Sequence, residues 1–240
     1  GTLTVADELL IEGDLRVGRL EAKTRDKITI TGDLYADKAA IVKRGKLEVQ
    51  GSAKAREIEA GSSLVVHQDL TCVSGRGGGS ISVGGNAKAQ KLSGGGSVKI
   101  EGDAEVGRVD AGGSAKIGGR CDCSEINVGG SVKVNNGKIQ RVSVGGAFKA
   151  EGAVEIEEID VGGAAKVGEG SSVASVDVGG SFKSAGGISF GSIDVGGAVK
   201  LGGNSKGDTI DVGGSVKVDG HLELTGDLDV GGKVTVDGDL

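Results

Sequence analysis

The stretch Ile126-Asn-Val-Gly-Gly-Ser-Val-Lys-Val134 decides the fold, because it returns along the chain at a nearly constant interval. Each copy places two alternating apolar residues on either side of a glycine pair. The interval is about 17 residues, and a short period of this kind is typical of solenoids, in which every repeat is one turn of chain stacked on its neighbours. Later copies begin at Val142, Ile159, Val176, Ile193, Ile210 and Leu228.

Within one turn, apolar residues come in three pairs. In the turn from Val142 these pairs are Val142 and Val144, Phe148 and Ala150, and Val154 and Ile156. Alternation with period two is the pattern of strands with one face buried. The sequence therefore predicts an all-β, single-stranded parallel β-helix, or β-solenoid. It should be triangular, with three short strands per turn and about 14 coils of about 17 residues each.

Glycine makes up 49 of the 240 residues and is predicted to form the corners, for example at Gly145-Gly146. Glycine suits such a position because it reaches positive φ and because it allows successive coils to stack closely. Side-chain volume is also balanced from coil to coil. Ala165 falls between Phe148 and Phe182 in the equivalent inward position.

One domain over residues 1–240 is expected, with an irregular coil at about 74–96. Repeats upstream begin at Leu9, Ile28, Leu47, Leu64 and Ile81, but the next begins at Leu92, well short of a full turn. We interpret this phase slip as a move of the glycine motif to the next corner. Just before it, Arg76 and Gly78 stand where inward apolar residues are expected. The glycine run is thus predicted to be a bulge or loop, either an insertion scar or a hinge or partner-binding notch.

Composition excludes several functions. The formal net charge is −6 with both signs spread along the chain, which provides no basic surface for nucleic acid. No apolar run reaches the length of a membrane span, and no signal-peptide pattern is present. Three cysteines are too few for a disulfide framework and favour an intracellular location.

No catalytic, cofactor-binding or metal-binding residue is predicted. The chain has no phosphate loop, nucleophile elbow or paired-carboxylate motif, and its two histidines, His67 and His221, fall at predicted corners. The period of this chain is about twice the nine-residue period of calcium-binding β-rolls. Cys72, Cys121 and Cys123 occupy inward positions. Core packing is favoured over a metal or redox role, since residues two apart on a strand splay poorly for a disulfide.

Charged residues recur on the outward face. Lysine is expected in one stripe and aspartate in another, forming either solvated faces that prevent aggregation or surfaces for lateral association that weakens with salt. Cation binding along the aspartate stripe also stays open. The lysine stripe is Lys54, Lys88, Lys99, Lys116, Lys133, Lys149, Lys166, Lys183, Lys200 and Lys217. The aspartate stripe is Asp110, Asp160, Asp177, Asp194, Asp211 and Asp229.

The recurring unit Ile11-Glu-Gly-Asp-Leu-Arg-Val17 resembles the repeats of bactofilins, a family of polymer-forming cytoskeletal proteins. It returns as Ile30-Thr-Gly-Asp-Leu-Tyr-Ala36 and Ile100-Glu-Gly-Asp-Ala-Glu-Val106. This resemblance implies a right-handed triangular β-helix whose copies join end to end into non-polar filaments without nucleotide. The chain departs from the family in having more coils, more Gly-Gly corners and no proline-rich flanks.

Both ends of the chain continue the apolar pattern, so we expect the terminal coils to bind other copies of the chain. The residues predicted for this contact are Leu3, Val5, Leu9, Ile11, Leu228, Val230, Val234, Val236 and Leu240. Open solenoid ends normally need a cap, and either segments outside this chain or another copy would provide one. The expected function is therefore a non-enzymatic scaffold that assembles into filaments.

Two alternatives stay open: an extracellular adhesin or surface-layer protein, and a carbohydrate-active β-helix enzyme. The main expectation is a cytoplasmic protein that is its own partner. Association with the membrane or cell envelope, through segments outside this chain, is also considered, as is an extracellular surface location.

Overall fold

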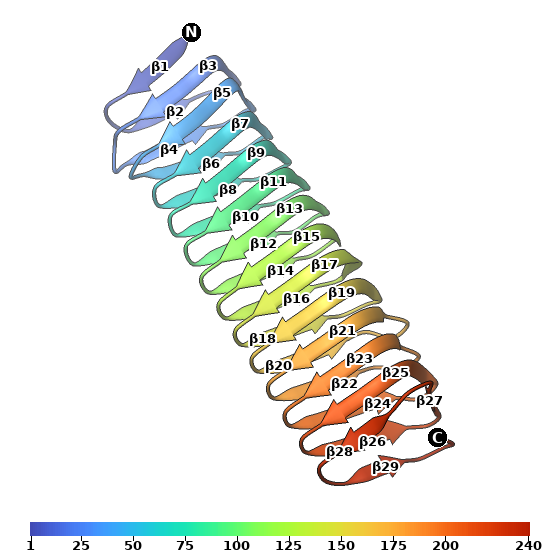
Figure 1. Ribbon diagram of the computed structural model, residues 1–240. Coiled ribbons are helices and arrows are strands. Elements are labelled where there is room, and N and C mark those ends of the chain that lie inside the picture. The colour runs from blue at the N-terminus through green and yellow to red at the C-terminus, as the bar shows by residue number, and fades with distance from the viewer. The chain divides into compact units, whose positions relative to one another are not determined.

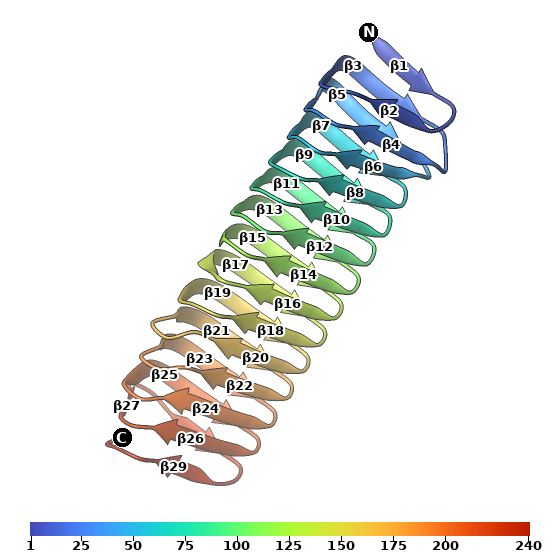
Figure 2. The same ribbon diagram turned by 180° about the vertical axis from the view of Figure 1, so that it is seen from behind.

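The computed structural model describes residues 1–240 and consists of β-strands that all pair in parallel. The chain divides into two compact units, Gly1–Cys123 and Ser124–Leu240. Each unit is a β-solenoid in which the strands of successive coils lie side by side (Figure 1, Figure 2). The predicted fold class is thus confirmed, with about 14 turns of about 17 residues. A single domain over the whole chain stays a prediction.

In the first unit, strands of two kinds alternate along the chain and form two sheets. One sheet runs in the order β1 (Thr2–Val5), β3 (Leu15–Ala22), β5 (Leu34–Val42), β7 (Ala53–Ala60), β9 (Leu70–Gly77), β11 (Ala87–Gly94) and β13 (Ala104–Ala111). The other runs β2 (Leu9–Ile11), β4 (Lys27–Ile30), β6 (Lys46–Val49), β8 (Ser63–Val66), β10 (Ser80–Val83), β12 (Ser97–Ile100) and β14 (Ser114–Ile117).

The second unit repeats this arrangement. Its long strands are β17 (Asn136–Val144), β19 (Val154–Val161), β21 (Ser172–Val178), β23 (Ser189–Val195) and β25 (Ser205–Val212), and both β27 (Leu222–Leu224) and β28 (Leu228–Val230) pair with β25. Its short strands are β16 (Ser131–Val134), β18 (Ala147–Ala150), β20 (Ala164–Val167), β22 (Ser181–Ser184), β24 (Ala198–Gly202), β26 (Ser215–Asp219) and β29 (Val234–Val236). The boundary between the units falls within β15 (Arg120–Val128).

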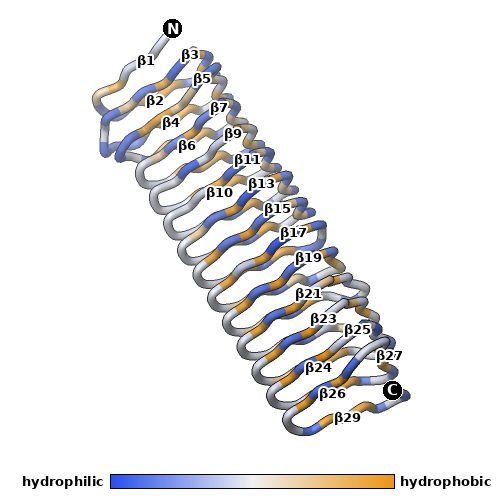
Figure 3. Tube along the Cα trace, in the orientation of Figure 1, coloured by the Kyte–Doolittle hydropathy of each residue, from blue (hydrophilic) through white to orange (hydrophobic).

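Each coil buries three pairs of inward residues, as predicted, but two strands carry them instead of three. In β19, Val154 and Ile156 are one buried pair and Ile159 and Val161 are the next. Glu157 and Glu158 lie between the two pairs, and neither is buried. The strand continues through this bend, and so do long strands that carry a glycine there, such as β13 at Gly107. Figure 3 shows the resulting alternation of hydrophobic and hydrophilic residues along the strands.

Glycine is required at the corners because the backbone of the neighbouring coil leaves no room for a side chain. Positive φ occurs at Gly13, Gly137, Gly170, Gly187 and Gly220 and at Asn204, but not in the repeated Gly-Gly pairs. The expected positive φ of those pairs is therefore wrong. A Cβ added at Gly179 would lie 2.5 Å from the carbonyl oxygen of Gly162 in the preceding coil. Close stacking of coils, the second reason given for these glycines, is confirmed.

The glycine run after Cys72 forms a regular strand as far as Gly77, and Gly78 and Gly79 form the corner before β10, so the expected bulge or loop is wrong. β9 pairs in register with β7 and β11, and Gly75 lies between Ile58 and Leu92. Gly75 and Gly77 occupy the inward positions while Arg76 and Gly78 are exposed. The inward space is filled from the next coil, because a Cβ on Gly75 would lie 2.6 Å from Cδ2 of Leu92.

The change of repeat phase at this point reflects the two kinds of strand. Ile81 lies on the short strand β10 and pairs with Val98, whereas Leu92 lies on the long strand β11. In both sheets the strands of these coils pair in constant register. The short interval between Ile81 and Leu92 therefore reflects a change from a short strand to a long strand, and no part of a coil is missing. The irregular pairing lies earlier, at register shifts between Val17 and Arg19 and between Ala36 and Ala39.

Candidate self-association surfaces

The first coil exposes residues that are buried in the coils behind it. Leu3 pairs with Leu20 and Leu9 pairs with Ile28, and both inner partners are fully buried. The outer residues are only half-buried, since a coil covers them on one side alone. The same holds for Val5 and Ile11. This face therefore presents apolar side chains and one unpaired edge of each sheet.

The last coil has the same character. Val230 pairs with Val212 and Val236 pairs with Val218, and in both cases the inner residue is buried and the outer one half-buried. Leu228 is also half-buried. Val234 is 40% exposed and Leu240 is 71% exposed. The nine residues predicted for the end contact are thus all at least partly open to solvent.

A row of lysines runs along the short-strand sheet of the second unit. Strand pairing places these residues side by side: Lys133, Lys149, Lys166, Lys183, Lys200 and Lys217. We call this set the lysine row. In the first unit, Lys99 and Lys116 are neighbours in the same way. Lys54 and Lys88 do not belong with them, because they lie on the long strands β7 and β11.

The lysine row is partly neutralised by acids at its two ends. Glu151 accepts from Nζ of Lys133 and of Lys149 at 2.8 and 2.9 Å, which lowers the pKa of its carboxyl to about 2. Asp219 is bound by Lys200 at 2.6 Å and by Lys217 at 3.2 Å, which likewise lowers its pKa. Lys166 and Lys183, in the middle of the row, make no ion pair.

A row of aspartates runs along the long-strand sheet of the same unit. Strand pairing aligns Asp160, Asp177, Asp194, Asp211 and Asp229. We call this set the aspartate row. All five are exposed, and none forms an ion pair within the chain. Asp110 lies apart from them on β13 and is bound by Lys91 and Arg108.

The corner before the long strands carries a further ladder that sequence reasoning missed. Asp69 Oδ1 accepts a hydrogen bond from the backbone N–H of Asn86 at 2.7 Å. Asn86 Oδ1 accepts from the N–H of Asp103 at 2.8 Å, and Asp103 accepts from the N–H of Arg120 at 2.7 Å. Asp14 and Asp33 do the same upstream. The signal was an Asp or Asn recurring at the coil spacing just before an apolar pair.

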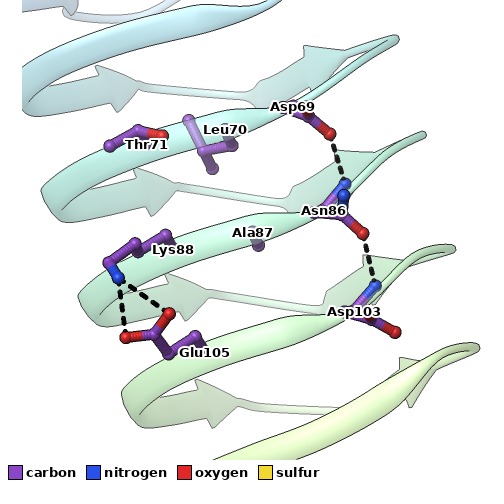
Figure 4. A pocket seen from close by; sticks show the side chains of 8 residues that line it. All are labelled: Asp69, Leu70, Thr71, Asn86, Ala87, Lys88, Asp103 and Glu105. Carbon is purple, nitrogen blue, oxygen red and sulfur yellow. Dashed lines mark hydrogen bonds and ion pairs between the residues drawn. The ribbon is translucent and has the colours of Figure 1, made fainter.

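A shallow hollow opens beside this ladder (Figure 4). Lys88 and Glu105 form an ion pair at 2.8 Å across its rim, and Leu70 and Ala87 lie along its wall. Thr71 supplies a hydroxyl there, with no histidine among the lining residues. The ladder residues use their side-chain oxygens to hold neighbouring coils together, so this arrangement has a structural explanation.

The cysteines are buried and free, as core packing predicts, and Cys121 and Cys123 lie side by side without forming a disulfide. The Sγ of Cys121 donates to the Sγ of Cys123 at 3.2 Å, and this hydrogen bond together with burial raises the pKa of Cys121. Burial raises the pKa of Cys72 to about 12. No group of three or more His, Cys, Asp or Glu side chains is placed to hold a metal ion.

Both histidines lie at corners and contact carboxylates. His67 Nε2 lies 3.1 Å from Oε1 of Glu48, which also binds Lys27 and Lys46. Hydrogen bonds from these two lysines are the main reason that the pKa of Glu48 falls to about 2. His221 Nδ1 accepts a hydrogen bond from the N–H of Asp239 at 3.0 Å. Each contact joins residues of neighbouring coils.

Comparison of the chain with protein-family models, with curated proteins and with solved structures found no match. A search for helices with the length and hydrophobicity of a membrane span found none. The proposals below therefore depend on the geometry of this chain.

Proposed function

We propose that this chain is a structural protein whose copies assemble end to end into filaments. The observation that carries the proposal is the exposure of core residues at the first and last coils. In interior coils the same positions are covered on both sides, for example at Leu20 and Ile28. A second copy placed against a terminal coil would bury its apolar side chains and pair its free strand edges.

The resemblance to bactofilins agrees with this proposal, since that family forms filaments without nucleotide. The resemblance also makes a cytoplasmic location, with association to the membrane or envelope through other segments, part of the proposal. The aspartate and lysine rows provide outward faces that are polar, so burial of apolar surface favours the ends over the sides. The proposed role is non-enzymatic.

The test is a charge placed in the terminal layer. Val234→Asp puts a carboxylate in the apolar end contact. The chain should stay folded but should not grow into filaments, because burying an unpaired charge has a large free-energy cost. The matched control is Thr235→Asp. It adds the same charge to the same strand, at a position that pairs with the outward residue Lys217.

Negative-stain electron microscopy measures the result. The parent chain and Thr235→Asp should form long fibres, and Val234→Asp should stay as short particles with an unchanged circular dichroism spectrum. The pair Leu9→Asp and Leu10→Asp repeats the comparison at the other end, since Leu9 is half-buried and Leu10 is 59% exposed. Fibres of normal length from both Val234→Asp and Leu9→Asp would contradict end-to-end growth.

A further inference from the structure

We infer that two copies of this chain also associate side by side, with the aspartate row of one copy docked on the centre of the lysine row of the other. The centre of the lysine row is Lys166 and Lys183. The partner is thus a second copy of the same chain, recognised by complementary charge. This contact is separate from the end contact proposed above and does not depend on it.

The aspartate row has no partner within its own chain. Its five carboxylates are exposed and lie on adjacent parallel strands, which are about 4.8 Å apart. Like charges at this spacing repel one another, although salt screens the repulsion. Several other carboxylates on the outer faces of this unit do have a cation nearby, such as Glu155, Glu158 and Asp219. The row is therefore an acidic surface that an external cation would stabilise.

The lysine row has free cations only at its centre, and the sequence explains why. Two residues after Lys149 and Lys217 stand Glu151 and Asp219, and these acids pair with them. The same two acids also pair with Lys133 and Lys200 of the preceding coils. The corresponding positions in the coils of Lys166 and Lys183 and in the next coil are Gly168, Ala185 and Gly202. Two adjacent ammonium groups are thereby left without a carboxylate.

The two rows match each other in spacing. Each advances by one strand for every coil, so both follow the same interval along their sheets. Ammonium groups of one copy can therefore meet successive carboxylates of another without drifting out of register. Small residues flank both rows, Ala164 and Ser181 beside the lysines and Ser175 and Ser192 beside the aspartates, and they allow the sheets to approach.

The rows of a single copy do not pair with each other. Asp160 and Lys166 are separated by the corner at Gly162-Gly163, and the two residues lie in different sheets. The acidic and basic surfaces are consequently free to engage different neighbours. A contact between unlike surfaces can repeat, and it yields either a closed ring or an open bundle.

The test uses reciprocal charge reversal on the full chain. One variant is Asp177→Lys with Asp194→Lys, and the other is Lys166→Glu with Lys183→Glu. Sedimentation velocity measures association in the Val234→Asp background and in the parent chain. The Val234→Asp chain should form side-by-side species at about 0.05 M salt, and its affinity for itself should fall about tenfold by about 0.5 M, because screening shortens the reach of the charges.

Each reversed variant alone should lose these species, and an equal mixture of the two should recover them. The control, Lys38→Glu with Lys54→Glu, makes the same charge change at lysines of the first unit that have no ion pair, and should behave as the parent. Circular dichroism confirms that each variant is folded.

Three outcomes would overturn the inference: a Val234→Asp chain that stays single at low salt, reversed variants that associate as their unreversed background does, or a mixture that fails to recover association. Association that requires added calcium and disappears with a chelator would also overturn it, since the aspartate row would then be bridged by cations. If Val234→Asp fails to stop fibre growth, the mixture experiment in the parent chain still reports on the lateral contact.

Discussion

At the scale of single residues, the repeated glycines serve the contact between one coil and the next. In the repeated Gly-Gly pairs that follow an inward valine, the first glycine lies against a carbonyl oxygen of the preceding coil, where a Cβ would approach to 2.5 Å at Gly179 and 2.6 Å at Gly196. Atoms cannot approach this closely without a shift of the backbone. A side chain at one corner would therefore force two coils apart.

Gly179→Ala should lower the free energy of unfolding by about 1 to 3 kcal/mol, the usual cost of overpacking. Gly186→Ala is the matched control, because a Cβ there would lie 3.7 Å from the nearest atom, the carbonyl oxygen of Gly203. Urea denaturation followed by circular dichroism measures both. Equal stability of the two variants would contradict the account of the corners.

Inward volume is balanced in the same way. Ala165 pairs with Phe148 on one side and Phe182 on the other, as the sequence predicts, and all three are buried. Phe190 similarly faces Gly207, and its ring fills the space that a side chain on Gly207 would occupy. Large residues thus alternate with small ones along the stack.

Ala165→Phe should therefore destabilise the chain by about 1 to 3 kcal/mol, because three large rings would then be adjacent. The double variant with Phe148→Ala restores the total volume and should regain part of the loss. Thermal or urea unfolding provides the measurement. A single variant that unfolds together with the parent chain would show that this layer is loosely packed.

At the scale of elements, ion pairs join neighbouring short strands on their outer face. Glu48 on β6 binds Lys27 on β4 at 2.8 Å and Lys46 at 2.7 Å, and its side chain is only 14% exposed. Because the folded pKa of about 2 lies below the usual value, this carboxylate stabilises the fold only while it is ionised. Its contribution is complete above the ordinary pKa of glutamate and is lost as the pH falls toward the folded value.

Glu48→Gln should thus be less stable than the parent at pH 7, with a gap that closes as the pH falls from about 4.5 to about 2. Above that range the gap should stay constant. Urea denaturation at several pH values measures it, with Glu223→Gln as a control at an exposed glutamate that has no ion pair. A gap of constant size down to the lower end of this range would mean that the lysines do not act on this carboxyl.

The sequence predicted the inward pairs because their period is strict, and coils such as that from Val142 were assigned correctly. It did not show that two of the three pairs share one strand, since that depends on an extended bend at residues such as Glu157. The glycine run that contains Gly75 and Gly77 was also wrongly predicted to be a bulge or loop. The side chain that fills their space, Leu92, belongs to the next coil, and a local reading of the glycine run does not include it.

The end residues and the charged rows were predicted from the sequence, whereas the Asp/Asn ladder was not. The end residues and both charged rows follow from the period, and strand pairing confirms which residues are neighbours. Lys54 and Lys88 were assigned to the wrong row, because the repeat phase changes between Ile81 and Leu92. The ladder of Asp69, Asn86 and Asp103 was missed, since its hydrogen bonds join side chains to the backbone of another coil.

At the scale of the whole molecule, the proposal is that stacking does not stop at the chain's own coils. Terminal residues such as Val234 and Leu3 are incompletely buried, and another copy would cover them. The charged rows would then control how filaments lie beside one another. End growth is driven by apolar burial and strand pairing, whereas lateral contact is driven by charge. The two contacts should therefore respond differently to salt.

X-ray diffraction from oriented fibres of the purified chain tests the central claim most directly. If coils stack along the filament and continue from copy to copy, the spacing between strands should appear as a reflection at about 4.8 Å parallel to the fibre axis. A reflection of this spacing perpendicular to the axis would show that copies join through their sides instead, and would contradict end-to-end assembly.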